Sequence, residues 1–233
     1  MKKSSIATLL VCCLLIPLTL FLGTKLPGRS YYITGTLIVL ELMVPFFMAF
    51  EGRRPQAREL VIIAVMCAIA VVGRVAIPIP HFKAIFGIIM LAGIAFGPET
   101  GFVVGAISAF VSNFFAGQGA YTPWQMFSFG LGGMLAGFAF AKGRLPRKAW
   151  LMAVFGFVTV ILVVGPILDS ITLFLGFAKW NRQVFAVVFA PGLAFNCLQG
   201  LCTMAVMLIF GKPLLYILDR IGKKYGIMGS YDW

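Results

Sequence analysis

The chain has 233 residues, of which 61% are hydrophobic and only 11% are charged, and its mean hydropathy is +1.01. A soluble domain carries about 25% charged residues, so this composition excludes one and favours a protein with large lipid-facing surfaces. The formal net charge of +12 is distributed in short clusters between apolar runs. Because that distribution is typical of membrane-protein loops, we expect no nucleic-acid binding.

Eight apolar segments follow one another along the chain. They are continuous instead of alternating, which favours transmembrane helices over barrel strands and predicts an all-α integral membrane protein. The first segment is not followed by a small-residue cleavage site, so we expect an uncleaved helix and not a signal peptide. The predicted segments are 6–23, 32–50, 59–77, 84–97, 101–116, 125–141, 150–176 and 184–210.

A charged run with a proline, Glu51 to Arg58, interrupts the apolar pattern and indicates a cytoplasmic linker. It predicts two units, an N-terminal transmembrane hairpin with its linker over 1–56 and a six-helix membrane domain over 57–233. Placing both termini in the cytoplasm puts most of the 19 Lys and Arg residues on the cytoplasmic side, as the positive-inside rule requires.

Polar side chains at membrane depth are candidates for function, because burying them there costs free energy. In the predicted topology they converge on the outer half of the six-helix unit, among aromatic and apolar side chains. That combination is typical of a small-molecule pocket. The candidate binding residues are Arg74, His81, Phe82, Asn113, Gln118, Tyr121, Trp124, Gln125, Asp169, Trp180, Asn196 and Gln199.

Each group of candidates also has a simpler interpretation. The aromatic side chains fit an interfacial belt, and the amides Asn196 and Gln199 fit hydrogen bonds between helices. An ion pair between Arg74 and Asp169 is a further alternative. The shared outer side of the bundle favours a pocket, because independent structural roles would not place all these residues together.

Small residues at helical spacing indicate faces where helices approach closely, as in Gly101-x-x-x-Gly105, Gly133-x-x-x-Gly137 and Ala64-x-x-x-Ala68. Motifs for chemistry are missing. The sequence has no G-x-x-x-x-G-K-[ST] phosphate loop and no H-E-x-x-H zinc motif. Its five cysteines lie in apolar runs, where they act as small hydrophobic residues. We therefore expect no enzyme activity, no metal and no cofactor.

Over about 57–225 the chain resembles the substrate-binding membrane subunits, or S components, of energy-coupling factor (ECF) vitamin transporters. The resemblance rests on the helix with Ala64 and Ala68, the turn 97–101, the stretch 105–113 and, most specifically, Thr122-Pro123-Trp124-Gln125-Met126-Phe127 before a glycine-rich helix. The hairpin at 1–50 is a departure, because typical members have six helices.

The resemblance implies a high-affinity vitamin-binding subunit in a prokaryotic cell membrane. It also implies three partners, a transmembrane coupling subunit and two cytoplasmic ATPases, with Ala64 and Ala68 facing the coupling subunit. The stretch around Trp124 is most similar to members associated with cobalamin or related corrinoids, and riboflavin or another small vitamin is the alternative. A stand-alone transporter or channel, and a membrane scaffold, are the competing hypotheses.

Overall fold

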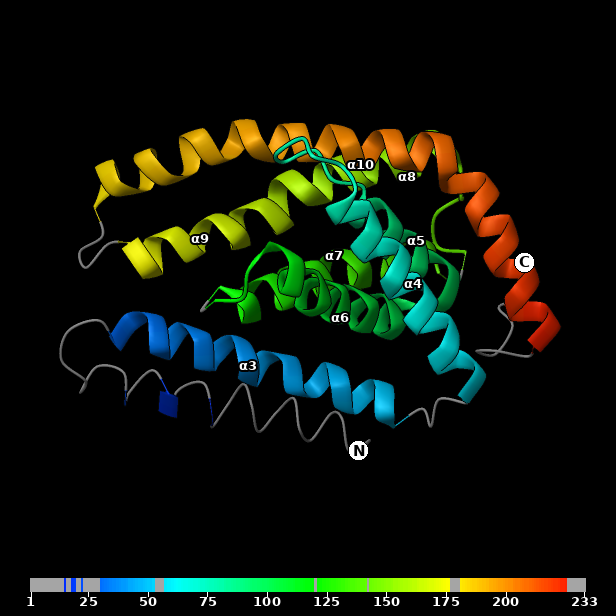
Figure 1. Ribbon diagram of the computed structural model, residues 1–233, viewed down its shortest axis with the longest axis horizontal. Coiled ribbons are helices and arrows are strands. Elements are labelled where there is room, and N and C mark those ends of the chain that lie inside the picture. The colour runs from blue at the N-terminus through cyan, green and yellow to red at the C-terminus, as the bar shows by residue number, and fades with distance from the viewer. Residues whose placement is uncertain are drawn as a thin grey trace.

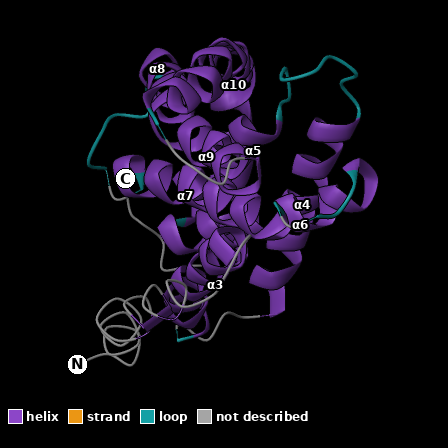
Figure 2. Cartoon of the chain, turned by 90° about the vertical axis from the view of Figure 1, so that its left-hand side faces the viewer, coloured by secondary structure: helices purple, strands orange, loops and turns teal. Residues whose placement is uncertain are grey.

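The computed structural model describes residues 30–52, 57–119, 121–141, 143–176 and 181–225, together with Leu15, Leu18, Thr19 and Leu22. Its regular elements in these ranges are all helices, without a strand (Figures 1 and 2), which confirms the all-helical prediction. The elements are α3 (Ser30–Glu51), α4 (Ala57–Val75), α5 (Ile85–Phe96), α6 (Pro98–Ala116), α7 (Thr122–Phe140), α8 (Ala149–Thr159), the π-helical turn η2 (Val160–Val164), α9 (Gly165–Gly176) and α10 (Arg182–Tyr225).

The predicted segments from 32 onward each coincide with a described helix, and 150–176 is one helical run of α8, η2 and α9. The predicted end at 210 is wrong, because α10 continues to Tyr225 through Pro213. Figure 1 shows α10 changing direction in its last part, as a proline inside a helix causes. Segment 6–23 lies mostly outside the described residues, so the count of eight spans stays a prediction.

In the described part of the chain, three helices are long and apolar enough to cross a membrane: Pro98–Ala116, Ala149–Leu173 and Arg182–Lys224. Helix α5 has 12 residues, about 18 Å at 1.5 Å per residue, and is too short to cross about 30 Å of hydrocarbon. Every α5 residue except Ala95 is buried, and the helix packs against α4, α6, α7 and α10. It is therefore the central core helix of the bundle.

Of the described helices, α6 and α7 pack most extensively against each other. A Cβ atom added to Gly133 would lie 2.3 Å from the backbone oxygen of Gly101, and one added to Gly105 would lie 2.4 Å from that of Phe129. These distances leave room only for hydrogen. The close packing predicted from the two glycine patterns is confirmed.

Helix α3 lies along the bundle against α6, α7 and α9 (Figure 1). Its Val39 and Met43 are buried in one hydrophobic cluster with Trp124 of α7. The hydroxyl of Thr19 donates a hydrogen bond to Glu41 Oε1 at 2.5 Å, so a residue of the first predicted segment contacts α3. The division into units at residue 56 stays a prediction.

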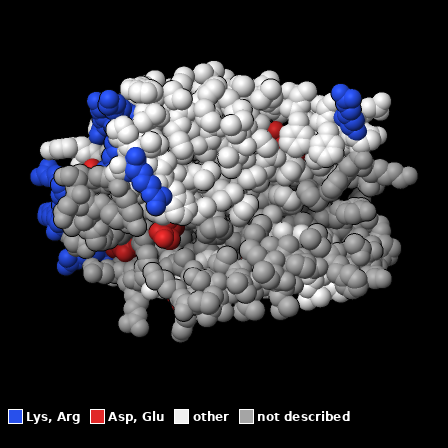
Figure 3. Space-filling model, turned by 180° about the vertical axis from the view of Figure 1, so that it is seen from behind, with Lys and Arg blue, Asp and Glu red and all other residues white. Residues whose placement is uncertain are grey.

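Charged side chains are distributed unevenly over the described surface. Figure 3 shows Lys and Arg gathered at the end of the molecule where α4 begins and α10 ends. Large apolar side chains, among them Phe114, Leu162 and Ile209, are more than half exposed along the helices. Apolar flanks with one basic end are typical of a protein embedded in a bilayer.

Candidate functional site

A network of hydrogen bonds joins the ends of α4 and α6 to the start of α7. Arg74 donates from Nη1 to Ser112 Oγ at 2.5 Å and to Asn113 Oδ1 at 2.9 Å. Asn113 Nδ2 donates to Thr122 Oγ1 at 3.2 Å, and the Thr122 hydroxyl donates to Gln118 Oε1 at 2.8 Å. We call these five residues the Arg74 network. Ser112 and Asn113 are fully buried and Gln118 is exposed, so the network runs from the interior of the bundle to its surface.

The connection between α6 and α7 folds back over this network. Gly117 has a φ of 103°, a left-handed conformation that favours glycine, and its N–H closes α6 on the carbonyl of Asn113 at 2.8 Å. The Tyr121 hydroxyl donates to the carbonyl of Gly117 at 2.6 Å, and Gln118 Nε2 donates to that of Phe110 at 3.0 Å. These bonds hold the loop over the Arg74 network.

Aromatic rings form one wall beside Arg74. The guanidinium carbon lies 5.4 Å from the centroid of the Phe129 ring, within the range of a cation–π contact. Phe86 packs edge-on against Phe129, with 4.5 Å between the ring centroids. A guanidinium has five N–H donors, and both described hydrogen bonds of Arg74 leave from Nη1. Within the described residues, Nε and Nη2 of Arg74 have no hydrogen-bond acceptor.

A second polar group joins the 76–84 loop, α9 and α10. Gln199 accepts a hydrogen bond from the backbone N–H of Lys83 at 3.1 Å and donates one to the carbonyl of the same residue at 2.7 Å. Asn196 Nδ2 donates to Asp169 Oδ2 at 2.8 Å. His81 stacks on Phe195, with 4.3 Å between the ring centroids. We call these residues the α10 polar group.

The contacts decide between some of the interpretations of these residues. Arg74 and Asp169 do not pair with each other, because Arg74 bonds to α6 and Asp169 accepts from Asn196. Asn196 and Gln199 do join separate segments through hydrogen bonds, as their structural interpretation expects. The oxygen and the nitrogen of the Gln199 side-chain amide both form hydrogen bonds with the backbone of Lys83.

The remaining described candidates are Trp124, Gln125 and Phe82. Trp124 is only 9% exposed and packs among side chains of α3, α6 and α9, so it is not an exposed belt residue. Gln125 is half-buried, and its Oε1 is buried without a hydrogen-bond partner in the part of the chain that the structure describes. Phe82 is half-buried in the 76–84 loop. Trp180 lies outside the described residues.

Ser112, Thr122, Lys83 and Phe195 also take part, although the sequence analysis did not select them. Each is a sequence neighbour of a selected residue or lies in a quoted motif, and that proximity was the only signal available. The described residues bring no three His, Cys, Asp or Glu side chains together as a metal site. The two groups offer hydrogen-bond donors, acceptors and aromatic faces, which suit binding.

A groove lies at the opposite, basic end of the bundle. It has a volume of about 520 Å³ and is bounded by the first half of α4 and the last part of α10. Ala64 and Ala68 are exposed on a neighbouring face of α4. None of the predicted binding residues lines the groove, so the two are separate.

Comparison with known proteins gives a family and one relative. The family described as "ECF-type riboflavin transporter, S component" matches residues 55–216. A UPF0397 protein of Vibrio atlanticus is 31% identical over 117 residues, which are 47% of this chain and 64% of that protein. The chain thus spans less than two thirds of that relative's length. No solved structure matches the chain.

Proposed function

Because the chain belongs to the family of ECF-type riboflavin transporter S components, we propose that it binds a vitamin as the membrane subunit of an ATP-driven importer. A transporter S component is not an enzyme, and the family assignment agrees with the sequence analysis on this point. The observation that carries the proposal is the Arg74 network, a partly buried polar cluster beside the Phe129 ring in which Arg74 Nε and Nη2 have no acceptor among the described residues.

The proposed substrate is riboflavin or a vitamin of the same flat, polar-edged kind. Ring systems pack against aromatic side chains, and Phe129 places an aromatic ring beside Arg74. The buried acceptor Gln125 Oε1 supplies a partner for a ligand N–H or O–H. The family description names riboflavin, which supports the alternative raised from the sequence over cobalamin, and a corrinoid stays a prediction to be tested.

The proposed importer contains a transmembrane coupling subunit and two cytoplasmic ATPases. The exposed Ala64 and Ala68 support a docking face on α4, because small residues allow another helix to approach closely. The chain would lie in the prokaryotic cell membrane with eight spans, the hairpin 1–56 preceding the binding domain 57–233. Both termini would be cytoplasmic, with the basic end of Figure 3 inside.

Binding to purified protein tests the substrate. We expect saturable binding of riboflavin in nanodiscs without ATP or an ion gradient, measured by quenching of flavin fluorescence, with cobalamin in a parallel titration. Arg74→Gln should weaken binding about tenfold or more, because a charged hydrogen-bond donor is lost. Arg182→Gln is the matched control, because Arg182 is exposed at the start of α10. Tight binding of cobalamin alone would overturn the riboflavin proposal, and folded protein that binds no vitamin would overturn both.

Docking on α4 is tested separately from vitamin binding. The double change Ala64→Leu and Ala68→Leu should reduce co-purification with the coupling subunit and leave vitamin affinity unchanged. Larger side chains would keep the partner helix at a distance. Val187→Leu serves as the control, since Val187 is exposed on another helix, α10. Vitamin flux into liposomes that contain this chain alone would instead favour a stand-alone transporter.

A further inference from the structure

Arg74 leaves one edge of its guanidinium group open. Nη1 donates to Ser112 and Asn113 of α6, and the Phe129 ring centroid lies 5.4 Å from the guanidinium carbon. Nε and Nη2 have no acceptor among the described residues. Neither is a buried polar atom that lacks a partner, so both are open to solvent. Their N–H groups lie side by side on the edge that binds a carboxylate or a phosphate through two parallel hydrogen bonds.

The charge of Arg74 is not neutralised by an acid in the part of the chain that the structure describes. Its two acceptors, Ser112 Oγ and Asn113 Oδ1, are both neutral. None of the described acidic residues forms an ion pair with Arg74. These acidic residues are Glu41, Glu51, Glu59, Glu99, Asp169 and Asp219.

Acids that could have paired with Arg74 are remote from it or bonded elsewhere. Glu59 begins the same helix, and the 15 residues between them correspond to about 22 Å at 1.5 Å per residue. Asp169 accepts a hydrogen bond from Asn196, and Glu41 accepts one from a threonine hydroxyl. A negative charge for Arg74 therefore has to come from outside the described chain.

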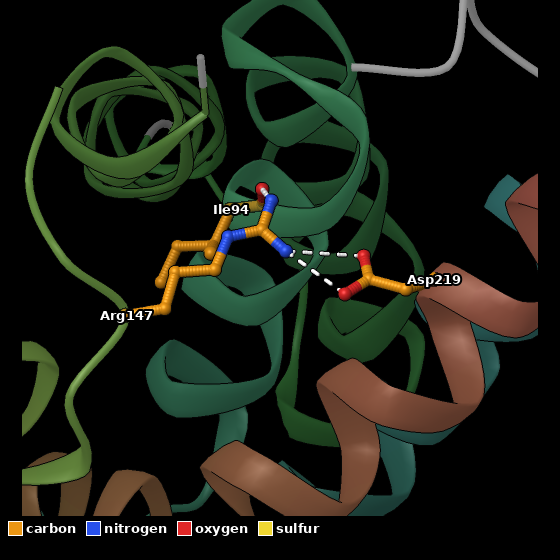
Figure 4. Close-up of polar contacts among 3 residues, drawn as sticks. All are labelled: Ile94, Arg147 and Asp219. Atoms are coloured by element: carbon orange, nitrogen blue, oxygen red, sulfur yellow. Dashed lines mark hydrogen bonds and ion pairs between the residues drawn. The ribbon is translucent and has the colours of Figure 1, made fainter. Parts of the chain in front are cut away.

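Arg147 shows how this fold neutralises a half-buried arginine when an acid is at hand (Figure 4). Arg147 Nη1 lies 3.1 and 3.0 Å from the two carboxylate oxygens of Asp219, and Nη2 donates to the carbonyl of Ile94 at 2.8 Å. Arg74 is half-buried as well, but it has neutral acceptors only. Because partial burial of an unpaired charge costs free energy, an anion at Arg74 would be stabilising.

We infer that the ligand of the Arg74 network carries an anionic group, a carboxylate or a phosphate, which pairs with Nε and Nη2 of Arg74. This assignment rests on the proposed vitamin binding and narrows the class of substrate. Among flavins it favours riboflavin 5′-phosphate (FMN) over riboflavin, because the two share one ring system and differ by the phosphate. The shared chemistry is the anionic group, which a vitamin carboxylate would also provide.

Parallel titrations of riboflavin and FMN test the inference, with protein in nanodiscs of phosphatidylcholine so that no anionic lipid competes. FMN should bind about tenfold more tightly, because hydrogen bonds between charged groups are the stronger class. Arg74→Gln should weaken FMN binding about a hundredfold and riboflavin binding about tenfold, so that the two ligands bind alike. Arg74→Lys keeps the charge without the two-donor edge and should retain part of the preference.

Arg182→Gln is the control, because it removes an exposed charge at the start of α10 and should leave the preference for FMN unchanged. Equal binding of the two flavins to the parent protein would overturn the anionic ligand and leave the vitamin proposal intact. A preference for FMN that persists in Arg74→Gln would overturn the role of Arg74. If neither flavin binds, the riboflavin proposal fails by itself. Mass spectrometry of the co-purified vitamin then decides: an acidic one supports the inference, and a neutral one overturns it.

Discussion

At the residue scale, the side-chain amide of Gln199 holds the 76–84 loop against the helix bundle. Gln199 uses both ends of its side chain on the backbone of Lys83, and it is only 8% exposed. His81 in the same loop adopts a φ of 55°, uncommon for a residue other than glycine, and stacks on Phe195. The Lys83 ammonium donates to the carbonyl of Ile77. These contacts fix the 76–84 loop over the end of the bundle.

Gln199→Ala should lower the free energy of unfolding by about 2 kcal/mol, because two hydrogen bonds are lost and backbone groups of Lys83 lose their partner. Thermal unfolding in detergent measures the change. Gln183→Ala, at an exposed position on the same helix, should leave the midpoint unchanged. Equal midpoints for the two variants would contradict the role assigned to Gln199.

The residue scale also shows what a sequence can and cannot predict. Arg74 and Asn113 were selected because polar groups at membrane depth are costly, and the structure does bring them together. Their actual partners depend on how α4, α6 and α7 are placed in space, which periodicity does not encode. For that reason an Arg74–Asp169 pair was a reasonable alternative from the sequence and is wrong in the structure.

At the element scale, glycine spacing determines how closely two helices approach. Gly101 and Gly133 oppose each other so closely that a Cβ on either would meet backbone atoms of the other helix. Gly132, the neighbour of Gly133, faces the end of the Val164 side chain at 3.2 Å instead. Adjacent glycines on α7 therefore have different tolerance for a methyl group.

Gly133→Ala should destabilise the protein by about 1 to 3 kcal/mol, because the helices must separate to admit the methyl group. Gly132→Ala should cost less, since Val164 Cγ2 needs to move by only a few tenths of an ångström and alanine favours the helix. Thermal midpoints of the two variants, compared with the parent, measure the difference. A larger loss in Gly132→Ala would show that the α6–α7 packing is described incorrectly.

The end of α10 could not be predicted from hydropathy. The apolar run stops near 210, where Lys212 and Pro213 appear, and both are ordinary signals for a helix end. The helix continues because the bent segment has its own packing, with Leu215 and Leu218 in the hydrophobic core. Tertiary contacts override local signals here. The bounds of the other helices were predictable because their apolar runs coincide with their ends.

At the scale of the whole molecule, the two ends of the bundle have different chemistry. The Arg74 network and the α10 polar group lie at one end, and most of the basic residues seen in Figure 3 lie at the other. The ion pair between Arg147 and Asp219 connects the α7–α8 loop to the bent part of α10, with side chains 17% and 32% exposed. This ion pair holds α10 in place at the basic end, and it involves no residue of the Arg74 network or of the α10 polar group.

Asp219→Asn should lower the free energy of unfolding by about 1 to 2 kcal/mol, between the values for exposed and buried ion pairs. The exchange Arg147→Asp with Asp219→Arg should recover part of the loss. Arg220→Gln, which changes an exposed neighbour, should have little effect. Vitamin affinity should be the same in all these variants, and a change in it would contradict the separation of the two ends.

The π-helical turn Val160–Val164 connects α8, which packs on α10, to α9, which carries Asp169. Such a turn holds one residue more than an α-helical turn, and its Val164 carbonyl accepts from Ser128 Oγ at 3.0 Å. Deleting one residue here would rotate α9 by about 100° relative to α8. This rotation would move Asp169 away from Asn196, whereas α8 would keep its contacts with α10. The number of residues at this point thus determines where Asp169 lies, a constraint that amino-acid substitutions alone would not reveal.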